Sequence, residues 1–280
     1  MAVNNLPADH APVSFLQDIA LKLRRHMVAM ARRQGAGYIA QGLGIADVLA
    51  ALYFHELRYD PQDPGWAGRD RFVLSTGHYS IALWAALAEV GVIPLAELDS
   101  YGADDSRLDM STLDTTPGVE MIGGSLGHGI GQAVGMALGL RLQGSAGRVF
   151  VELSDGEMQE GAVWEGAMAG AHFGLDTLVA LIDCNGIQAD GALVLDMEPV
   201  AAKWRAFGWE TAEIDGNDMA QVVNALHGAR SRSGRPKAIV LRTRPGKGIA
   251  TLEARERAHF VRVDMAEWDD LARELEAAHG

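Results

Sequence analysis

Two apolar runs, each followed at once by polar residues and glycine, mark the centre of the chain. Residues 149–153 form a mostly apolar, β-branched run that stops at Ser-Asp-Gly, the sequence containing Asp155. Residues 178–182 form a second run that stops at Asp-Cys-Asn-Gly, which contains Asn185. Such runs are typical of parallel strands that are covered on both faces. Residues 162–173, between the runs, are rich in alanine and lack proline, so the whole segment predicts one βαβ unit.

The same patterns alternate along the rest of the chain. An apolar stripe with helical period runs through residues 14–34, where Ser14 and Gln17 can form a capping box. The glycine-rich residues 35–44 are expected to break that helix. Further helices are expected at residues 45–57, 81–90, 201–209, 219–229 and 267–278 and up to residue 142, and further strands at 71–74, 211–214 and 238–243. This alternation predicts an α/β fold, a doubly wound and mostly parallel sheet with helices on both faces.

Composition changes this picture little but excludes several classes of protein. The 280 residues are 48% hydrophobic, which is enough for a sizeable core. Residues 1–12 are polar with two prolines and are expected to form a flexible arm, while residues 13–280 are expected to form one domain. The formal net charge of −13, from 24 Lys+Arg and 37 Asp+Glu, argues against nucleic acid or an anionic membrane as a partner.

Cysteine content and hydropathy bear on the compartment. The single cysteine, Cys184, excludes an internal disulfide and a cysteine-based zinc site. Residues 1–12 lack the basic start and apolar core of a signal peptide, and no apolar run reaches membrane-spanning length. We therefore expect a cytoplasmic protein that does not enter a membrane.

Asp155 and Asn185 are candidate ligands because each follows a predicted parallel strand. The carboxyl ends of such strands meet at one edge of the sheet, where open α/β folds bind ligands. A carboxylate and an amide carbonyl are hard oxygen ligands, which suit Mg²⁺ or Ca²⁺ better than zinc. Magnesium commonly completes its shell with waters and substrate phosphates, so the pair indicates a metal-bridged diphosphate. The alternative is that Asp155 caps the following helix and Asn185 with Gly186 forms a turn, and the pair alone does not exclude it.

A histidine, a long irregular segment and a glycine-rich helix lie near the same predicted edge. His78 follows the strand at residues 71–74, where it is either a structural histidine or a site residue. Residues 98–120 are long and irregular, and such segments in compact domains are often functional. Glycines recur every four residues from Gly127 to Gly139 and make a smooth helix face. Glycine in a helix costs up to about 1 kcal/mol relative to alanine, so we expect close packing along this face and ligand contact at its first turn.

The stretch that begins at Ser154 resembles a known cofactor-binding motif. It reads Ser-Asp-Gly-Glu-Met-Gln-Glu-Gly, then Trp-Glu and a histidine, then Leu-Val-Ala-Leu-Ile-Asp-Cys-Asn-Gly-Ile-Gln-Ala-Asp-Gly. This closely resembles the thiamine diphosphate motif of the transketolase family, which begins Gly-Asp-Gly and ends in one or two asparagines. Ser154 replaces the first glycine of the family motif.

The resemblance implies thiamine diphosphate as the cofactor and Mg²⁺ or Ca²⁺ as the metal. It implies that Asp155, Asn185 and the backbone carbonyl of Ile187 hold the metal. Gly156 would let the backbone approach the diphosphate, and Glu157 would adjoin the cofactor. Residues 13–280 would then form the diphosphate-side domain of the thiamine diphosphate-binding fold.

The resemblance extends beyond this motif. His78 and His259 match family histidines that act in catalysis beside the cofactor, and Glu160 matches a glutamate that links paired sites across a subunit interface. For Glu160 the alternative is an exposed carboxylate stabilised by the helix dipole. The remaining cofactor contacts would be Tyr38, Gly124, Ser125 and Leu126, the last three of them against the aminopyrimidine ring.

Two departures from the family pattern bear on the substrate. Tyr38 stands where the family has the histidine of a Gly-His-Pro-Gly loop. No histidine occurs between His78 and His128, although the family has one there that contacts the donor sugar. The resemblance therefore leaves open whether Tyr38 and the loop at residues 104–116 replace those histidines.

The resemblance covers residues 14–275 and only the amino-terminal half of a full-length transketolase. The pyrimidine-binding half, with the glutamate that activates the cofactor, is not in this chain. The resemblance thus implies the N-terminal subunit of a split, two-component transketolase, assembled as an α2β2 heterotetramer with a C-terminal partner. Its activity would be transfer of a two-carbon ketol unit from a ketose or ketose phosphate to an aldose in carbohydrate metabolism.

Two alternatives to this function remain open. One is half of another thiamine diphosphate enzyme that acts on a 2-oxo acid or an unphosphorylated ketose, which Tyr38 and the missing loop histidine favour. The other is a non-catalytic subunit that keeps the fold. Retention of Asp155, Asn185 and His78 argues against the second alternative.

Overall fold

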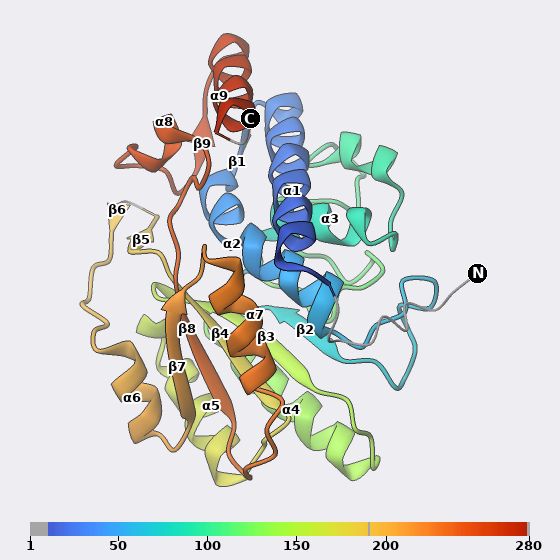
Figure 1. Ribbon diagram of the computed structural model, residues 1–280, viewed down its shortest axis with the longest axis vertical. Coiled ribbons are helices and arrows are strands. Elements are labelled where there is room, and N and C mark those ends of the chain that lie inside the picture. The colour runs from blue at the N-terminus through green and yellow to red at the C-terminus, as the bar shows by residue number, and fades with distance from the viewer. Residues whose placement is uncertain (1–10, 190, 279–280) are drawn as a thin grey trace.

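A five-stranded parallel sheet forms the centre of the computed structural model, which describes residues 11–189 and 191–278 (Figure 1). All neighbouring strands in this sheet run parallel, which confirms the predicted α/β sheet. Residues 1–10 of the expected N-terminal arm lie outside the described residues. In spatial order the strands are β2 (Arg71–Leu74), β3 (Val149–Ser154), β4 (Leu178–Cys184), β8 (Lys237–Arg242) and β7 (Glu210–Asp215).

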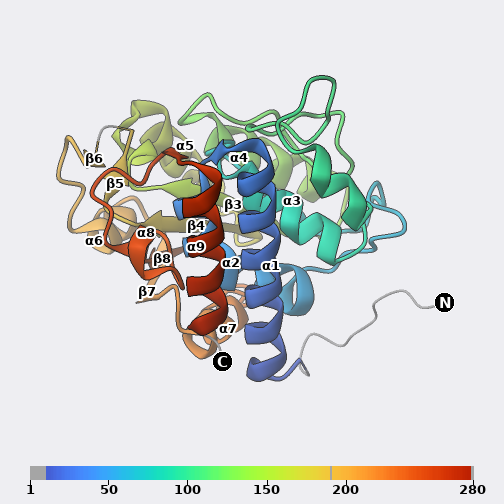
Figure 2. The same cartoon turned by 90° about the horizontal axis from the view of Figure 1, so that it is seen from above.

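Helices cover both faces of the sheet. One face carries α1 (Val13–Gln34), α2 (Ile39–Ala51), α3 (Ser80–Glu89), α7 (Met219–Gly228) and α9 (Met265–Ala277). The other carries α4 (His128–Leu142), α5 (Gly161–His172) and α6 (Val200–Ala206). Figure 2 shows α1 and α9 on one side of the strands and α4 and α5 on the other. The predicted doubly wound arrangement is therefore confirmed.

The two faces have separate cores because the side chains of each strand alternate. Phe150 and Val179 belong to the core beneath α1, α2, α3, α7 and α9, whereas Val151 and Ala180 belong to the core beneath α4, α5 and α6. Each strand is thus apolar on both faces, which explains the continuous apolar runs in the sequence. Fully burying one such side chain contributes about 1.5–3 kcal/mol.

The connections create a crevice at the carboxyl edge of the sheet. The segment after β2 leads to α3 on one face, whereas the segment after β3 leads to α5 on the other face. Neighbouring strands whose connections diverge in this way leave a crevice between them, which is the usual ligand site of open α/β sheets. The two segments whose sequences indicate site chemistry therefore meet there.

The start of α1 differs from the prediction. The helix begins at Val13 with Pro12 as its N-cap residue, and no side chain caps it, so the predicted capping box of Ser14 and Gln17 is wrong. Proline suits a helix start because its φ is already close to the helical value. The helix ends as expected, at Gly35, which has φ of 77°.

The start of α2 also differs from the prediction. Residues 39–44 were expected to lie in the break between two helices, but they are helical. A Cβ at Gly42 would lie 2.8 Å from the sulfur of Met27, and one at Gly44 would lie 3.2 Å from the carbonyl oxygen of Arg244. These glycines allow α2 to pack closely against α1 and the chain after β8. Close packing thus outweighs the low helix propensity of glycine. The helix continues beyond Ala51 as a π-helical turn, Leu52–Glu56.

Two short antiparallel strand pairs could not be predicted from the sequence pattern, because each strand has only two residues. The pair of β1 (Ala36–Gly37) and β9 (Val261–Arg262) brings the chain before α2 beside the chain before α9. The pair of β5 (Ile187–Gln188) and β6 (Gly191–Ala192) folds the segment after β4 into a hairpin. Both pairs position residues of the site described below. The other short elements are the 3-10 turns Leu95–Ser100 and Glu157–Gln159 and the helix α8 (Ala250–Glu253).

The remaining elements agree with their expected positions to within a few residues. The exception is α6, which ends at Ala206 and not at residue 209, because Gly208 adopts φ of 91°. None of the helices in residues 11–189 and 191–278 is long and apolar enough to cross a membrane.

Candidate active site

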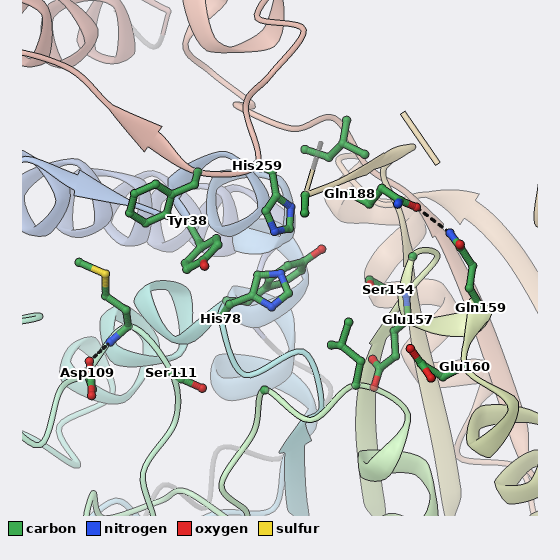
Figure 3. Close-up of a pocket in the computed structure, with 18 residues that line it drawn as sticks. Tyr38, His78, Asp109, Ser111, Ser154, Glu157, Gln159, Glu160, Gln188 and His259 are labelled. Carbon is green, nitrogen blue, oxygen red and sulfur yellow. Dashed lines mark hydrogen bonds between the residues drawn. The ribbon is translucent and has the colours of Figure 1, made fainter. Parts of the chain in front are cut away.

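A cavity of about 730 Å³ opens at the carboxyl ends of β2, β3 and β4. Figure 3 shows Tyr38, His78 and His259 on one side of it and Glu157, Glu160 and two glutamines on the other. Of the predicted site residues, the lining includes Tyr38, His78, Gly124, Leu126, Gly156, Glu157, Glu160, Ile187 and His259. Ser125 is exposed outside the lining, while Asp155 and Asn185 are hydrogen-bonded behind the cavity floor.

One wall of the cavity is a cluster of rings. Tyr38 contacts His78 edge to face, with centroids 5.0 Å apart, and contacts His259 at 5.4 Å. The two histidine rings lie 5.0 Å from each other. Burial, with a smaller effect of His259, lowers the pKa of His78 to about 4, so His78 is neutral at physiological pH. The β1–β9 pairing explains how residues so distant in the sequence meet here.

The loop that carries His78 is held by a contact between two backbones. Gly77 has φ of 59°, and a Cβ there would lie 2.3 Å from the backbone nitrogen of Gly124. A Cβ at Gly123 would lie 2.5 Å from the Cα of Gly77. The segment after β2 and the segment before α4 therefore touch without any side chain between them, which places His78 and Gly124 in the same cavity.

Asp155 bridges the segments that follow β3 and β4. Its Oδ1 accepts a hydrogen bond of 2.8 Å from the amide of Gly156, and its Oδ2 accepts one of 2.7 Å from the amide of Gly186. Burial raises the pKa of Asp155 above its usual range, although both hydrogen bonds favour the charged form. Asp155 does not cap a helix, since the N-cap residue of α5 is Glu160. The helix-cap alternative for Asp155 is therefore excluded.

Asn185 is oriented by two bonds from its amide nitrogen. The Nδ2 group donates to Asp183 Oδ2 at 2.7 Å and to the hydroxyl of Tyr79 at 2.8 Å. Carboxylate oxygens only accept hydrogen bonds, so the atom of the Asn185 amide that faces Asp183 must be the nitrogen. The amide oxygen, Oδ1, therefore points away from Asp183. Oδ1 accepts from the amide of Ile187 at 3.0 Å, which is the turn that the sequence also allowed. An oxygen has two lone pairs, so this turn does not exclude metal binding.

Three buried carboxylates at or near the cavity have no cationic partner among residues 11–189 and 191–278. Burial raises the pKa of Glu157 to about 7 and that of Asp183 to about 7. Burial likewise raises the pKa of Glu152 well above its usual range. Glu157 accepts hydrogen bonds from Ser75 and from the amide of Gly127, so it ties the start of α4 to the sheet.

Glu160 and the glycine face of α4 lie toward the outside. Glu160 is exposed at the start of α5, where both alternatives for its role remain. Gly127 packs as expected, because a Cβ there would lie 2.9 Å from the Cβ of Glu160. A Cβ at Gly131, Gly135 or Gly139 would meet no atom of the described residues within 4 Å. The expected close packing is thus absent at these three glycines within the described part of this chain.

The donor set fits a hard divalent cation with a diphosphate. One buried carboxylate, one oriented amide oxygen and the nearby segment of Ile187 are oxygen donors of the kind magnesium takes. Gly156 lines the cavity, and a Cβ there would be in ordinary van der Waals contact with Gln188 at 3.6 Å. The described residues contain no cluster of three or more His, Cys, Asp or Glu side chains able to hold a metal.

Several lining residues were missed from the sequence. Gln159 and Gln188 face each other with a hydrogen bond of 2.7 Å, and Phe260 packs on Tyr38 with centroids 4.9 Å apart. Asp109 also lines the cavity and lies in the long segment that was expected to be functional. Gln159 follows shortly after Asp155, and Gln188 follows shortly after Asn185. Their position just after a strand end is the sequence signal that could have identified them as site residues.

The protein is thus a doubly wound α/β domain whose cavity, at the carboxyl edge of the sheet, is lined by two histidines and by Ser154 and Gly156 on either side of Asp155. The family model of the transketolase thiamine diphosphate binding domain matches residues 17–276. The chain therefore belongs to the transketolase family and comprises its thiamine diphosphate-binding domain.

Its relatives include proteins of similar length. A putative uncharacterized transketolase family protein of Sinorhizobium fredii is 52% identical over 94% of this chain and 95% of its own length. A 6-deoxy-6-sulfo-D-fructose transketolase subunit of a Clostridium species is 38% identical over 93% and 96%, respectively. One of the apulose-4-phosphate transketolase subunits of Phocaeicola vulgatus is 33% identical over 91% of each chain.

Solved structures show the same fold within longer chains. The transketolase of Campylobacter jejuni superposes with a TM-score of 0.88 at 29% identity, covering 96% of this chain but only 43% of that one. The transketolase of Leishmania mexicana gives a TM-score of 0.83 at 27% identity over 94% and 44%. The expected family and fold are thus confirmed, and the chain spans less than half the length of these transketolases.

Proposed function

We propose that this chain is the thiamine diphosphate-binding subunit of a two-component transketolase in cytoplasmic carbohydrate metabolism. The assembled enzyme transfers a two-carbon ketol unit from a ketose or ketose phosphate to an aldose. The observation that carries this proposal is the cavity that His78 and His259 line together with Gly156 and Ile187, which lie within two residues of Asp155 and Asn185. The relatives also support the proposal, because chains of similar length are named as transketolase subunits.

Under this proposal the floor of the cavity anchors the cofactor. Asp155, Asn185 and the carbonyl of Ile187 would hold Mg²⁺ or Ca²⁺, and the backbone at Gly156 would border the diphosphate. Bound thiamine diphosphate supplies a nucleophilic carbon and an electron sink for breaking and forming carbon–carbon bonds. The protein binds and orients the cofactor and excludes water around it.

The ring wall and the glycine-rich segment contact the rest of the cofactor and the substrate. His78 and His259 donate and accept hydrogen bonds at substrate hydroxyls, where they also move protons. Tyr38 takes the place of a histidine and donates one hydrogen bond. The aminopyrimidine ring lies against the segment Gly124, Ser125 and Leu126, and Glu157 supports this segment through the amide of Gly127.

The partner is a C-terminal subunit with the pyrimidine-binding half, in an α2β2 assembly. Leu126 and Phe260 line the cavity and remain 37% and 38% exposed, so the rim presents apolar surface to solvent. Exposed apolar surface beside a binding site is typical of a protein–protein interface. Glu160, exposed at the same rim, then lies where it can link paired sites across the assembly.

The charge of the cavity favours a second candidate for the substrate. The charged side chains among its described lining residues are Asp109, Glu157 and Glu160, and none of these lining residues is a lysine or arginine. A substrate phosphate would find no cationic partner here. The donor is therefore an unphosphorylated ketose or 2-oxo acid, or its phosphate is bound by the partner subunit.

Reconstitution tests the proposed function. The purified 280-residue chain, with thiamine diphosphate and Mg²⁺, is expected to show no ketol transfer, because the half that activates the cofactor is not in this chain. Adding a subunit that carries the pyrimidine-binding half is expected to restore turnover. Turnover is followed by the aldose and ketose products formed from a panel of donors and acceptors. Turnover by the purified chain alone would refute the need for a partner, and a complete assembly without turnover would favour the non-catalytic alternative.

A further inference from the structure

Gln41, on α2, reaches His259 from behind the cavity wall. Its side chain is buried, with 1% exposure, although glutamine is mostly found at the surface. Nε2 lies 2.7 Å from Nδ1 of His259 and 3.0 Å from the backbone carbonyl oxygen of the same residue. One amide group thus contacts both the ring and the backbone of the histidine.

The contact with the carbonyl determines which way the amide of Gln41 is turned. A carbonyl oxygen only accepts hydrogen bonds, so the atom 3.0 Å from it must be the NH2 group. The reversed amide would place oxygen against oxygen and leave its NH2 group where Oε1 now lies. Oε1 is buried without a hydrogen-bond partner among the described residues, so that position offers the NH2 group no acceptor.

This orientation decides the tautomer of His259. The same NH2 group donates to Nδ1 of His259, so Nδ1 must carry a lone pair. A neutral imidazole has one proton, which is then on Nε2. A proton on Nδ1 would point at the amide hydrogens of Gln41, in either the neutral or the charged form of the ring.

His78 is held in the opposite tautomer. Its Nδ1 lies 2.5 Å from the carbonyl oxygen of Thr76, which only accepts, so Nδ1 carries the proton. Its pKa is lowered to about 4, which keeps the ring neutral and leaves a lone pair on Nε2. The two rings are 5.0 Å apart, and both line the cavity.

We propose that Gln41 is a positioning residue that sets His259 as a hydrogen-bond donor opposite His78 as an acceptor. The cavity wall then carries a complementary pair, Nε2–H on one histidine and a lone pair on the other. A hydroxyl fits such a pair, because its oxygen accepts from His259 while its hydrogen is donated to His78. A carboxylate, which only accepts, satisfies His259 alone.

The consequence for the substrate rests on the proposed function, whereas the tautomers do not. If the assembled enzyme acts on ketoses, this pair recognises one substrate hydroxyl by both its oxygen and its hydrogen. A site that bonds a hydroxyl in this way discriminates strongly against the deoxy analogue, which offers neither the oxygen nor the hydrogen of that hydroxyl.

The tautomers are measured directly by long-range proton–nitrogen correlation spectra of the full chain labelled with ¹⁵N-histidine. In the native chain at neutral pH, His259 is expected to show an unprotonated Nδ1 and a protonated Nε2, and His78 the reverse. His259→Gln and His78→Gln variants assign the two signals by their loss. A native His259 with its proton on Nδ1, or the same tautomer in both rings, would overturn the proposal without any need for a Gln41 variant.

Two substitutions then test the role of Gln41 itself. Gln41→Met keeps the length of the side chain without the amide, and a protonated Nδ1 is expected to become detectable at His259. Gln41→Glu replaces the donor with an acceptor and is expected to move the proton of His259 largely to Nδ1. In both variants the signal of His78 is expected to stay unchanged, because its tautomer depends on Thr76.

Gln34→Met is the matched control, since the Nε2 group of Gln34 also donates to a backbone carbonyl, that of Gly102, away from the cavity. It is expected to leave both tautomers as they are. Unchanged His259 tautomers in both Gln41 variants, with unfolding midpoints close to native, would show that Gln41 does not set them. None of these spectra requires turnover, so an assembly without ketol transfer would refute the proposed function and leave the tautomer assignment standing.

Discussion

Individual polar atoms around the cavity are oriented by the backbone before any ligand arrives. Both oxygens of Asp155 accept backbone amides, and the amide of Asn185 is turned by a carboxylate and a tyrosine hydroxyl. Side chains that are fixed in this way lose little further entropy on binding. Substitutions of single residues therefore give the most direct tests of the proposed metal site and of the choice of substrate.

Asp155→Ala removes the only charged oxygen donor proposed for the metal. Mg²⁺-dependent binding of thiamine diphosphate to the assembled protein is expected to weaken by more than about 100-fold, since even the loss of an outer hydrogen-bond partner costs 10–100-fold at metal sites. Isothermal calorimetry with and without Mg²⁺ measures the effect.

Asp176→Ala is the control for this experiment. Asp176 also accepts a backbone amide, that of Gly234, but it precedes β4 at the opposite edge of the sheet. Its substitution is expected to leave cofactor affinity within about twofold of native. Unchanged affinity in Asp155→Ala would show that the metal is held elsewhere.

Tyr38→His is expected to change the choice of substrate. Tyrosine is bulkier than histidine and presents one hydroxyl in place of two ring nitrogens. We expect the native assembly to prefer substrates other than xylulose 5-phosphate with ribose 5-phosphate, the ordinary pair of the family. The substitution should shift relative kcat/KM toward that pair by about tenfold or more, as expected where a site gains a hydroxyl contact.

Tyr38→Phe separates the effect of the ring from that of the hydroxyl. It keeps the contacts of the ring with His78, His259 and Phe260 and is expected to retain the native order of substrates at reduced kcat/KM. The measurement is kcat/KM over a panel of ketoses and 2-oxo acids. A native assembly that works best on the ordinary pair would contradict this prediction.

The site residues show how far sequence reasoning reaches at this scale. Asp155 and Asn185 could be selected because strand ends are visible as abrupt ends of apolar runs. Gln41 could not, because nothing in a glycine-rich segment indicates that one amide will meet a histidine more than two hundred positions away. Phe260 was likewise invisible until the β1–β9 pair placed it beside Tyr38.

At the scale of elements, the segment after β2 and the segment before α4 approach so closely that a Cβ at Gly77 does not fit between them. Gly77→Ala introduces a Cβ that would lie 2.3 Å from the nitrogen of Gly124 and 2.5 Å from the carbonyl carbon of Gly123. Both are backbone atoms, so no side chain can turn away to relieve the overlap. The free energy of unfolding is expected to fall by about 2–5 kcal/mol, from overpacking together with the cost of a positive φ.

Gly91→Ala isolates the second of these costs. Gly91 has φ of 91°, and a Cβ there would meet nothing within 4 Å. Its substitution is expected to cost only about 1–2 kcal/mol. Urea unfolding followed by circular dichroism measures both variants. Equal losses of unfolding free energy in the two variants would mean that the backbone contact between the segments does not contribute to stability.

Elements with a strong pattern were predicted well, and the errors have identifiable physical causes. The stripe of α1 and the apolar runs of β3 and β4 located those elements to within two residues. The start of α2 was misplaced because packing against α1 and the chain after β8 overrides the low propensity of its glycines. Close packing was also expected along the outer glycines of α4, where none occurs within the described part of this chain.

For the whole molecule, the alternation of elements was enough to predict the parallel sheet and its two layers of helices. Both faces of β3 and β4 are apolar, and only helices on both sides can cover them. The substrate and the partner could not be predicted in the same way. They depend on the rim of the cavity, where Tyr38 departs from the family pattern and where the apolar side chains of Leu126 and Phe260 remain exposed.

The cavity wall is assembled from parts of the chain as distant as Tyr38 and His259, joined by β1 and β9. A chain that has folded only in part therefore has no binding site, and any ligand of the cavity selects completely folded molecules. Mass action then adds about 2.7 kcal/mol of stability when the free ligand exceeds its Kd 100-fold. The supply of cofactor would in this way regulate how much of the protein survives proteolysis in the cell, apart from any effect on turnover.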